Sequence, residues 1–312
     1  MQTPYFSIIT PAYNRAAFLP ETIRSVLQQS FENWEYIIID DDSKDNTAEI
    51  LASYSDPRII RIKNDTNLER GASRNKGIAT AKGKYICFLD SDDAFFPNHL
   101  KVLFDNIQIR QEPIALLYTT SFQRINNGPI HKREFVPFDE KNKYAYIMHY
   151  TFNHNCVCVH KEIFNHFKYD PTIPGLEDID LWLHIATKFP IYQINEYTNL
   201  LNFHQGSYTH GDYERFTKEL RNFNYIFNKP EFKGLLPRSK KNRLLSMCHY
   251  HLAHRYQSEN KVFLMYKSIF KSFFFYPLGY NGRTNKPLFV MAVYGLPLFG
   301  FLLKSLYSIF KK

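Results

Sequence analysis

Two clusters of carboxylates are the residues in this sequence with the clearest capacity for chemistry. Asp40-Asp41-Asp42-Ser43 follows one apolar run, and Asp90-Ser91-Asp92-Asp93 follows another. An Asp at the end of a strand is often a cap or turn residue, and this explanation suits Asp42 and Asp45. Two clusters that converge would repel each other, however, unless a cation lies between them, most often a metal ion. The pair of clusters therefore favours a cation site.

A second acidic feature is the pair Glu177-Asp178, which follows a Pro-Gly turn. Acidic residues in the first turn of a helix are favoured by the helix dipole, so a purely structural role is open. Neighbouring carboxylates also raise the pKa of one member of the pair, which is a useful property for a general base. Further on, residues 202–207 are expected to form a loop that carries His204, as a surface residue or as a ligand.

The elements that must position these residues alternate between strand and helix patterns. Apolar runs predict strands at 6–10, 35–40, 59–62 and 85–89, and helical spacing predicts helices at 20–29, 47–54 and 72–81. Such alternation predicts an α/β fold with a mostly parallel sheet, which binds ligands outside the carboxyl ends of its strands. Because both aspartate clusters follow expected strands, we expect them at this edge. Residues 94–210 are less regular, with a helix expected at 96–109 and strands at 115–122 and 156–160.

Absent motifs narrow the range of functions. No G-x-G-x-x-G follows the first strand, and no G-x-x-x-x-G-K-[ST] occurs in the 312 residues. A dinucleotide-dependent dehydrogenase and a P-loop enzyme are both poorly supported. Four cysteines in a chain of this length do not form a disulfide framework, and no secretory signal is visible, so we expect a reducing, cytoplasmic compartment.

The positive charge is concentrated at one end of the chain. The net charge is +9, but residues 211–312 hold 18 Lys and Arg against 5 Asp and Glu, a net of +13. This block is also rich in aromatic residues, which is typical of a membrane-surface contact and not of a nucleic-acid-binding domain. The alternative is a solvated basic face over an aromatic core. Residues 287–303 carry no charge, and they are expected to form an interfacial or re-entrant segment, a packed helix or a span.

The ordered motifs resemble those of the family 2 glycosyltransferases, over roughly residues 5–210. The matching segments are Ser7-Ile8-Ile9-Thr10-Pro11-Ala12-Tyr13-Asn14-Arg15, Asp40-Asp41-Asp42-Ser43, Gly71-Ala72-Ser73-Arg74-Asn75-Lys76-Gly77, Asp90-Ser91-Asp92-Asp93, Glu177-Asp178 with Leu181-Trp182-Leu183, and His204 with Ser207. The resemblance implies the GT-A fold, with a Rossmann-like, mostly parallel sheet flanked by helices. It divides the chain into a catalytic domain, 1–210, and a helical, membrane-associated appendage, 211–312. Within the catalytic domain, 1–100 would bind the nucleotide and 101–210 the acceptor.

The activity implied by the resemblance is an inverting sugar transfer. The donor would be a nucleotide-diphosphate sugar, most simply a UDP-sugar, and the cofactor a divalent metal, Mn²⁺ or Mg²⁺. The acceptor would be a hydroxyl of a glycan or lipid-linked saccharide in the synthesis of a bacterial surface polysaccharide or glycolipid. The enzyme would then work at the inner face of the cell membrane, with no nucleic-acid partner.

The resemblance also assigns residues to the donor and the metal. Asp41 would accept the uracil N3–H, with Pro11 and Tyr13 bordering the base and Asn14 close by. Arg74 would face the pyrophosphate with help from Arg70, and Asp90 and Ser91 would also border the donor. Asp92 would hold the metal with Asp90 nearby, and His204 would complete its shell or contact a phosphate.

The acceptor side is assigned to the acidic pair. Asp178 would be the general base that deprotonates the acceptor hydroxyl, and Glu177 would hold the acceptor or orient the loop. Two positions depart from the family pattern: Asp42 replaces a Gly, and Asn202 replaces an Arg that could contact the diphosphate.

Two other functions remain as alternatives at this point. A sugar-nucleotide nucleotidyltransferase would usually have a Gly-rich loop after the first strand, which this chain lacks. A catalytically inactive, membrane-associated scaffold is opposed by the intact residues Asp41, Asp90, Asp92 and Asp178.

Overall fold

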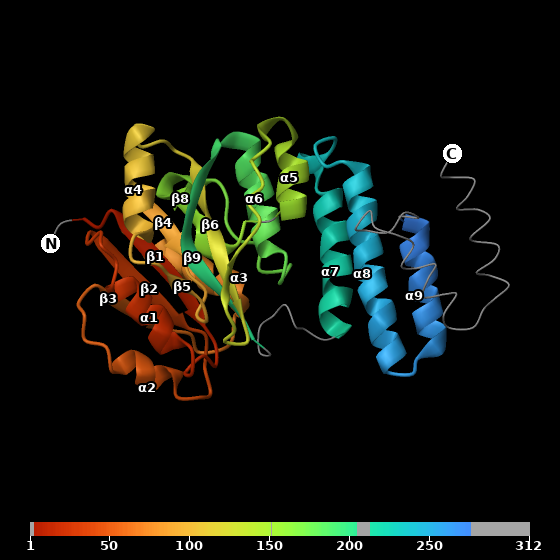
Figure 1. Ribbon diagram of the computed structural model, residues 1–312, viewed down its shortest axis with the longest axis horizontal. Coiled ribbons are helices and arrows are strands. Elements are labelled where there is room, and N and C mark those ends of the chain that lie inside the picture. The colour runs from red at the N-terminus through yellow and green to blue at the C-terminus, as the bar shows by residue number, and fades with distance from the viewer. Residues whose placement is uncertain (1–2, 151, 205–212, 276–312) are drawn as a thin grey trace. The chain divides into compact units, whose positions relative to one another are not determined.

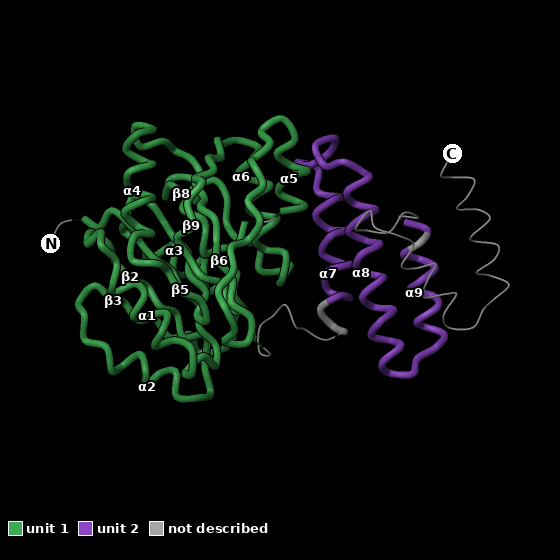
Figure 2. The backbone as a smooth tube through the Cα atoms, in the orientation of Figure 1, with its two compact units in different colours: residues 1–210 green, residues 211–312 purple. Residues whose placement is uncertain are grey.

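The computed structural model describes residues 3–150, 152–204 and 213–275 (Figure 1). The chain divides into two compact units, residues 1–210 and residues 211–312 (Figure 2). The first unit is built around a sheet flanked by helices, and the described part of the second is helical. Ser207 and the uncharged segment 287–303 lie outside the described residues.

The first half of the sheet is parallel, as the sequence predicts. Its strands lie in the order β3-β2-β1-β4 and all neighbours run in the same direction. The strands are β1 (Phe6–Ala12), β2 (Trp34–Asp40), β3 (Ile59–Lys63) and β4 (Tyr85–Phe88). The helices between them are α1 (Leu19–Leu27), α2 (Thr47–Ala52) and α3 (Glu69–Thr80). This arrangement brings the carboxyl ends of β1, β2 and β4, with both aspartate clusters, to one edge.

Helices cover both faces of the sheet, which explains why the strands are apolar on both sides. On one face, Ile23 of α1 joins Ile8 of β1 in a continuous buried cluster. On the other face, Gly77 of α3 lies against Ile9 of β1, and Trp182 packs beside the central strands. Apolar burial of this kind contributes about 25 cal/mol per Å².

The second half of the sheet mixes directions. Strand β8 (Val157–His160) runs antiparallel to β4 and to β6 (Leu116–Ile125), and β6 runs parallel to β9 (Ile191–Phe203). The short strands β5 (Ala94–Phe95) and β7 (Ile130–Lys132) pair antiparallel with β9 and β6. It follows that β6 and β9 end, and β8 begins, at the edge that carries the aspartates. Strand β9 extends through Asn202 and Phe203, where the sequence suggested a loop.

Three helices accompany this half of the sheet. They are α4 (His99–Ile109), α5 (Lys143–Tyr150) and α6 (Glu177–Lys188), and α5 packs against α6. Short 3-10 turns occupy Glu140–Asn142, His154–Cys156 and Lys161–Asn165. Gly175 adopts a φ of 88°, so the expected Pro-Gly turn leads directly into α6. Glu177 and Asp178 therefore occupy the first turn of that helix.

The second unit contains α7 (Tyr213–Asn228), α8 (Arg238–Ser258) and α9 (Val262–Phe275), with a 3-10 turn at Pro230–Phe232. Helix α8 packs against both α7 and α9. Leu252 and Tyr256 of α8 meet Met265 and Ile269 of α9 in a small buried cluster. Within residues 3–275 as described, no helix combines the length and apolar character that a bilayer crossing requires.

Gly77 offers a direct test of how tightly α3 packs on the sheet. A Cβ there would lie 2.6 Å from Cγ2 of Ile9, whereas a Cβ at Gly71 would meet nothing closer than 3.5 Å. Gly77→Ala should therefore lower the free energy of unfolding by about 1–2 kcal/mol, because overpacking outweighs the gain in helix propensity. Gly71→Ala, the matched control in the same helix, should leave stability unchanged or raise it. Urea denaturation measures both, and equal behaviour of the two variants would contradict this packing.

Candidate functional site

A cleft of about 230 Å³ lies at the carboxyl edge of the parallel strands. It is lined by five of the residues that the sequence assigned to the donor: Pro11, Tyr13, Asp41, Arg70 and Ser91. Pro11 lies near the end of β1, Asp41 follows β2 and Ser91 follows β4, so the parallel topology itself gathers them. Binding clefts are expected at this edge of an open α/β sheet.

Asp41 is held rigidly in the wall of the cleft. Its Oδ1 accepts hydrogen bonds from Nδ2 of Asn64 at 2.7 Å and from the Leu68 backbone N–H at 2.9 Å. Because both donors engage the same oxygen, the carboxylate is fixed in one orientation while the residue lines the cleft. An acceptor fixed in this way is suited to recognise an N–H group of a planar base.

The turn after β2 explains two other sequence features. Asp42 adopts a φ of 65°, a left-handed conformation in which the family's Gly is free of strain and an Asp is tolerated. Asn14, which was expected close to the base, is not among the residues that line the cleft, although its neighbours Tyr13 and Arg15 are. Its Oδ1 accepts a hydrogen bond from the Lys44 backbone N–H at 2.8 Å, so the carboxamide braces the loop after β2 instead. Nearby loop amides attract this short polar side chain more effectively than the open cleft.

Arg74 also departs from its expected place. Its side chain is only 1% exposed, and the guanidinium donates to Oδ1 of Asp90 at 2.7 Å and to Oε1 of Glu177 at 3.2 Å. Two carboxylates draw the guanidinium inward, and it therefore cannot face a pyrophosphate in this arrangement. We call this contact the Arg74 bridge. It joins the loop after β4 to the first turn of α6.

The charges of the Arg74 bridge stabilise one another. Burial opposes ionisation of Arg74, but Asp90, Tyr169 and Glu177 raise the pKa of its guanidinium. Burial likewise opposes ionisation of Asp90, and Arg74 nevertheless keeps the pKa of that carboxyl below its usual value. Against the same effect of burial, Arg70 and Arg74 lower the pKa of Glu177. All three members therefore stay charged near neutral pH.

The carboxyl of Asp178 differs from these three groups in its pKa. Burial, and then the negative charge of Glu177, raise the pKa of Asp178 to about 7. The neighbouring Glu177 is fixed by Arg74 and also accepts a hydrogen bond from the Gly175 backbone N–H at 2.6 Å. These contacts tie Glu177 both to Arg74 and to the turn before α6. A carboxyl with a pKa near 7 is suited to take up a proton at neutral pH.

Asp92 and His204 meet at the same edge. Nε2 of His204 lies 3.1 Å from Oδ2 of Asp92, and the imidazole stacks on Phe18 with ring centroids 4.2 Å apart. Burial and the nearby Asp90 raise the pKa of Asp92, so its anionic form would gain from a further cation. An aspartate oxygen with an imidazole nitrogen is a ligand set that suits Mn²⁺, with other positions left to substrate oxygens. These two residues therefore fit a divalent ion.

Asp90 does not join Asp92 and His204, because the Arg74 bridge holds its carboxylate. In the described ranges, no group of three or more His, Cys, Asp or Glu side chains is arranged to hold a metal by itself. Asn202, which replaces the family's Arg, donates from its backbone N–H to Oδ1 of Asp93 at 2.6 Å and from Nδ2 to the Asp92 carbonyl at 2.8 Å. The replacement therefore fixes the aspartate loop.

Arg15 and Asn155 are among the residues of the site that were not assigned from the sequence. Arg15 lines the cleft, and its Nε lies 3.7 Å from Oδ2 of Asp92. Its position at the end of the first motif could have indicated a phosphate contact. Asn155 accepts a hydrogen bond from the Asp90 backbone N–H at 2.6 Å and donates to Asp93. The local sequence does not predict a role for Asn155, because its hydrogen-bond partners lie more than sixty residues away in the chain.

Comparison with known proteins agrees with this fold. Residues 7–172 match the model of Glycosyl transferase family 2, and the chain belongs to this family. It is 32% identical over 195 residues to UDP-Glc:alpha-D-GlcNAc-diphosphoundecaprenol beta-1,3-glucosyltransferase WfgD of Escherichia coli. The aligned region covers 61% of this chain and 72% of WfgD. The expected GT-A fold class is confirmed, and the protein is a glycosyltransferase.

Two solved structures share the fold at low sequence identity. The mannosyltransferase PcManGT of Pyrobaculum calidifontis, in complex with GDP-Man and Mn²⁺, matches with a TM-score of 0.62 and 13% identity, over 95% of this chain and 81% of that one. TarS 1-349 of S. aureus, in complex with UDP-GlcNAc, matches with a TM-score of 0.59 and 18% identity, over 85% and 79% of the two chains.

Removing the Arg74 charge should destabilise the protein strongly. Arg74→Gln leaves the half-buried carboxylate of Asp90 and the buried carboxylate of Glu177 without their shared cation. Loss of one partner of a buried ion pair costs about 3–5 kcal/mol. Urea denaturation at pH 7 should show this loss, while Arg61→Gln on the exposed side of β3 should change stability by less than about 0.5 kcal/mol. Equal stability of Arg74→Gln and the wild type would contradict the Arg74 bridge.

Proposed function

We propose that this glycosyltransferase moves a sugar from a UDP-sugar to a hydroxyl of a saccharide or lipid-linked acceptor, with inversion at the anomeric carbon. Its products would be a surface polysaccharide or glycolipid. The proposal takes residues 1–100 as the nucleotide-binding half and 101–210 as the acceptor half. The names of WfgD and of the TarS complex support a UDP-sugar donor.

The observation that carries the proposal is the raised pKa of the Asp178 carboxyl, which lies next to the Arg74 bridge in the chain. Asp178 has a carboxyl pKa of about 7, and the neighbouring Glu177 is tied through Arg74 to Asp90. In the reaction, Asp178 takes the proton of the acceptor hydroxyl as its oxygen bonds to the anomeric carbon. The bond from that carbon to the diphosphate breaks on the opposite side, and UDP carries away the electron pair.

Positive side chains and a fixed carboxylate would bind the nucleotide-sugar donor. Arg15 and Arg70 line the cleft and offset the charge of the diphosphate, while Asp41 is oriented to recognise the base. Asp92 and His204 would hold a Mn²⁺ or Mg²⁺ ion. When bound, such an ion neutralises charge on the leaving diphosphate. The Mn²⁺ named for PcManGT supports this assignment.

The alternatives are weaker. A sugar-nucleotide nucleotidyltransferase does not agree with membership of a glycosyltransferase family. An inactive scaffold is opposed by the intact residues Asp41, Asp90, Asp92 and Asp178.

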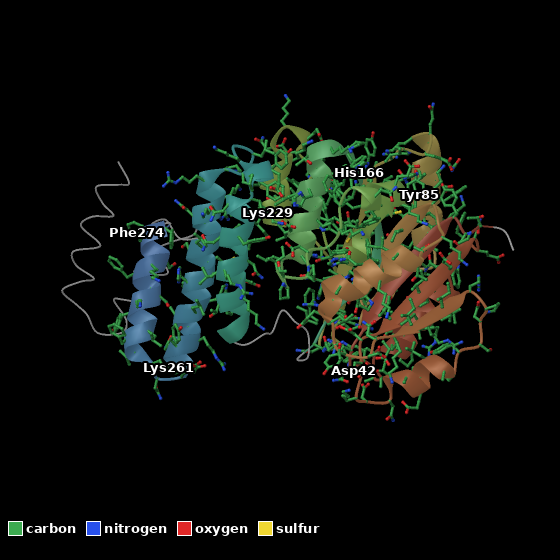
Figure 3. All side chains as sticks on the ribbon, turned by 180° about the vertical axis from the view of Figure 1, so that it is seen from behind. Asp42, Tyr85, His166, Lys229, Lys261 and Phe274 are labelled. Carbon is green, nitrogen blue, oxygen red and sulfur yellow. The ribbon has the colours of Figure 1, made fainter. Side chains whose placement is uncertain are left out.

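Helix α9 supports a membrane partner at the inner face of the cell membrane. Phe263, Phe270 and Phe274 are 78%, 53% and 74% exposed, and their spacing places them on one side of the helix with the exposed Lys267 and Lys271. Phe274 lies near the end of α9, and Lys261 lies just before its start (Figure 3). We call Phe263, Lys267, Phe270, Lys271 and Phe274 the α9 stripe. Exposed aromatics among lysines suit the surface of an anionic bilayer, where a lipid-linked acceptor would reside.

The enzymatic proposal is tested with a panel of UDP-sugars and Mn²⁺. Wild-type protein should release UDP from at least one donor, and Asp178→Asn should reduce transfer at least a hundredfold, the usual contribution of a general base. The Kd of the donor should stay within about threefold. Because the base must be unprotonated, kcat/KM of the wild type should rise with pH and level off above about pH 7.

The matched control is Asp105→Asn, which changes an exposed carboxylate on α4. It should behave as the wild type does. Ordinary turnover by Asp178→Asn would exclude Asp178 as the base, and no UDP release from any donor would overturn the proposed function.

The membrane proposal is tested by sedimentation with vesicles of phosphatidylglycerol and phosphatidylcholine. The full chain should bind these vesicles and not vesicles of phosphatidylcholine alone. Replacing the three phenylalanines of the α9 stripe by serine should reduce binding at least tenfold, whereas Ile109→Ser, at an equally exposed apolar position on α4, should not. Unchanged binding by the triple variant would contradict a role for the stripe.

A further inference from the structure

A second cavity, distinct from the donor cleft, lies within residues 118–193. Its volume is about 300 Å³, at the low end of the range for small-molecule sites, which is about 300–1,000 Å³. It shares no lining residue with the donor cleft. Strand β6, residues 133–136 and helix α5 contribute most of its walls, and Figure 1 shows α5 and β6 in the same half of the first unit as α6.

The walls of this cavity are aromatic and held in place. Tyr118 stacks on Phe152 with ring centroids 4.1 Å apart, and the Tyr118 hydroxyl donates to that of Tyr146 at 3.2 Å. The Tyr146 hydroxyl donates in turn to the Val136 carbonyl at 2.7 Å. Tyr150 lies beside Tyr146 and remains 45% exposed. Rigid aromatic faces with polar groups at their edges suit the apolar face and hydroxyls of a sugar ring.

Arg133 adds a positive charge to the cavity. It is half-buried and lines the cavity, and its backbone is fixed by a hydrogen bond from its N–H to the Ser121 carbonyl and by one that its carbonyl accepts from Tyr197. Within the described residues, its guanidinium makes no hydrogen bond or ion pair, although Glu134 also lines the cavity. An unpaired guanidinium of this kind is suited to bind phosphate or carboxylate.

The cavity is connected to the catalytic machinery at two points. Phe152 in its wall accepts a hydrogen bond from Nε1 of Trp182 at 3.2 Å, and Trp182 lies on α6, whose first turn carries Asp178. Cys156 in its floor directly follows Asn155, which binds the loop of Asp90 and Asp93. A ligand in the cavity would therefore contact Phe152 and Cys156, in a segment whose hydrogen bonds reach α6 and the loop of Asp90 and Asp93.

We infer that this cavity binds the acceptor, and that the acceptor is a saccharide carrying an anionic group. Its ring packs against Tyr146 and Tyr150, and Arg133 binds its phosphate or carboxylate. The inference rests on the proposed function and adds the chemical class of the second substrate. A sugar phosphate and a uronic acid share this chemistry, and the experiment below separates them.

The test measures binding to the full chain by saturation-transfer NMR, with N-acetylglucosamine 1-phosphate, glucuronic acid and neutral N-acetylglucosamine as probes. At least one anionic sugar should bind more tightly than the neutral one. Arg133→Gln should weaken that binding about tenfold or more, the effect of one charge-assisted hydrogen bond. Tyr150→Ala should weaken binding of all sugars that bind. Lys132→Gln is the matched control, because its ammonium lies over the Tyr197 ring, and it should change binding less than twofold.

Three results would overturn the inference: no binding of either anionic sugar to the wild type, unchanged binding to Arg133→Gln, or displacement of the sugar by UDP. Failure of the proposed function is seen separately, as the absence of UDP release by the wild type. The sugar that binds identifies the anionic group as phosphate or carboxylate.

Discussion

The placement of one buried arginine between two carboxylates organises this active site. Arg74 is excluded from solvent and must be paired, since an isolated charge in the interior is strongly unfavourable. It pairs with Asp90, which follows a central strand, and with Glu177, which begins a helix from the other half of the sheet. The loop after β4 and the first turn of α6 are therefore fixed to each other by the same cation.

The fixed charge of Glu177 has a chemical consequence for its neighbour. Arg70 and Arg74 keep Glu177 ionised, and this negative charge, together with burial, raises the pKa of Asp178. Two adjacent carboxyls are thereby given different roles, one structural and one suited to accept a proton. The separation depends on their surroundings, because Asp178 has no comparable contact with Arg74.

Much of this arrangement could be predicted from the sequence, and the remainder depends on distant contacts. The apolar runs of β1, β2 and β4 predicted a parallel sheet, which in turn places Asp41 and Ser91 at one edge. The buried position of Arg74 was not predictable, because its partner Glu177 lies 103 residues away. Strand β9 was missed because polar residues interrupt its apolar pattern. The cavity around Arg133 likewise exists only once β6, α5 and β9 have packed.

The central claim is that the surroundings of Asp178 prepare it as a base, and its titration tests this claim most directly. Carbon-13 NMR of the Asp178 carboxyl in the wild-type protein measures its pKa, and the signal can be assigned by comparison with Asp178→Asn. The account predicts a pKa of about 7, which Glu177→Gln should lower. A pKa near 4 in the folded wild-type protein, the ordinary value for an aspartate, would contradict it.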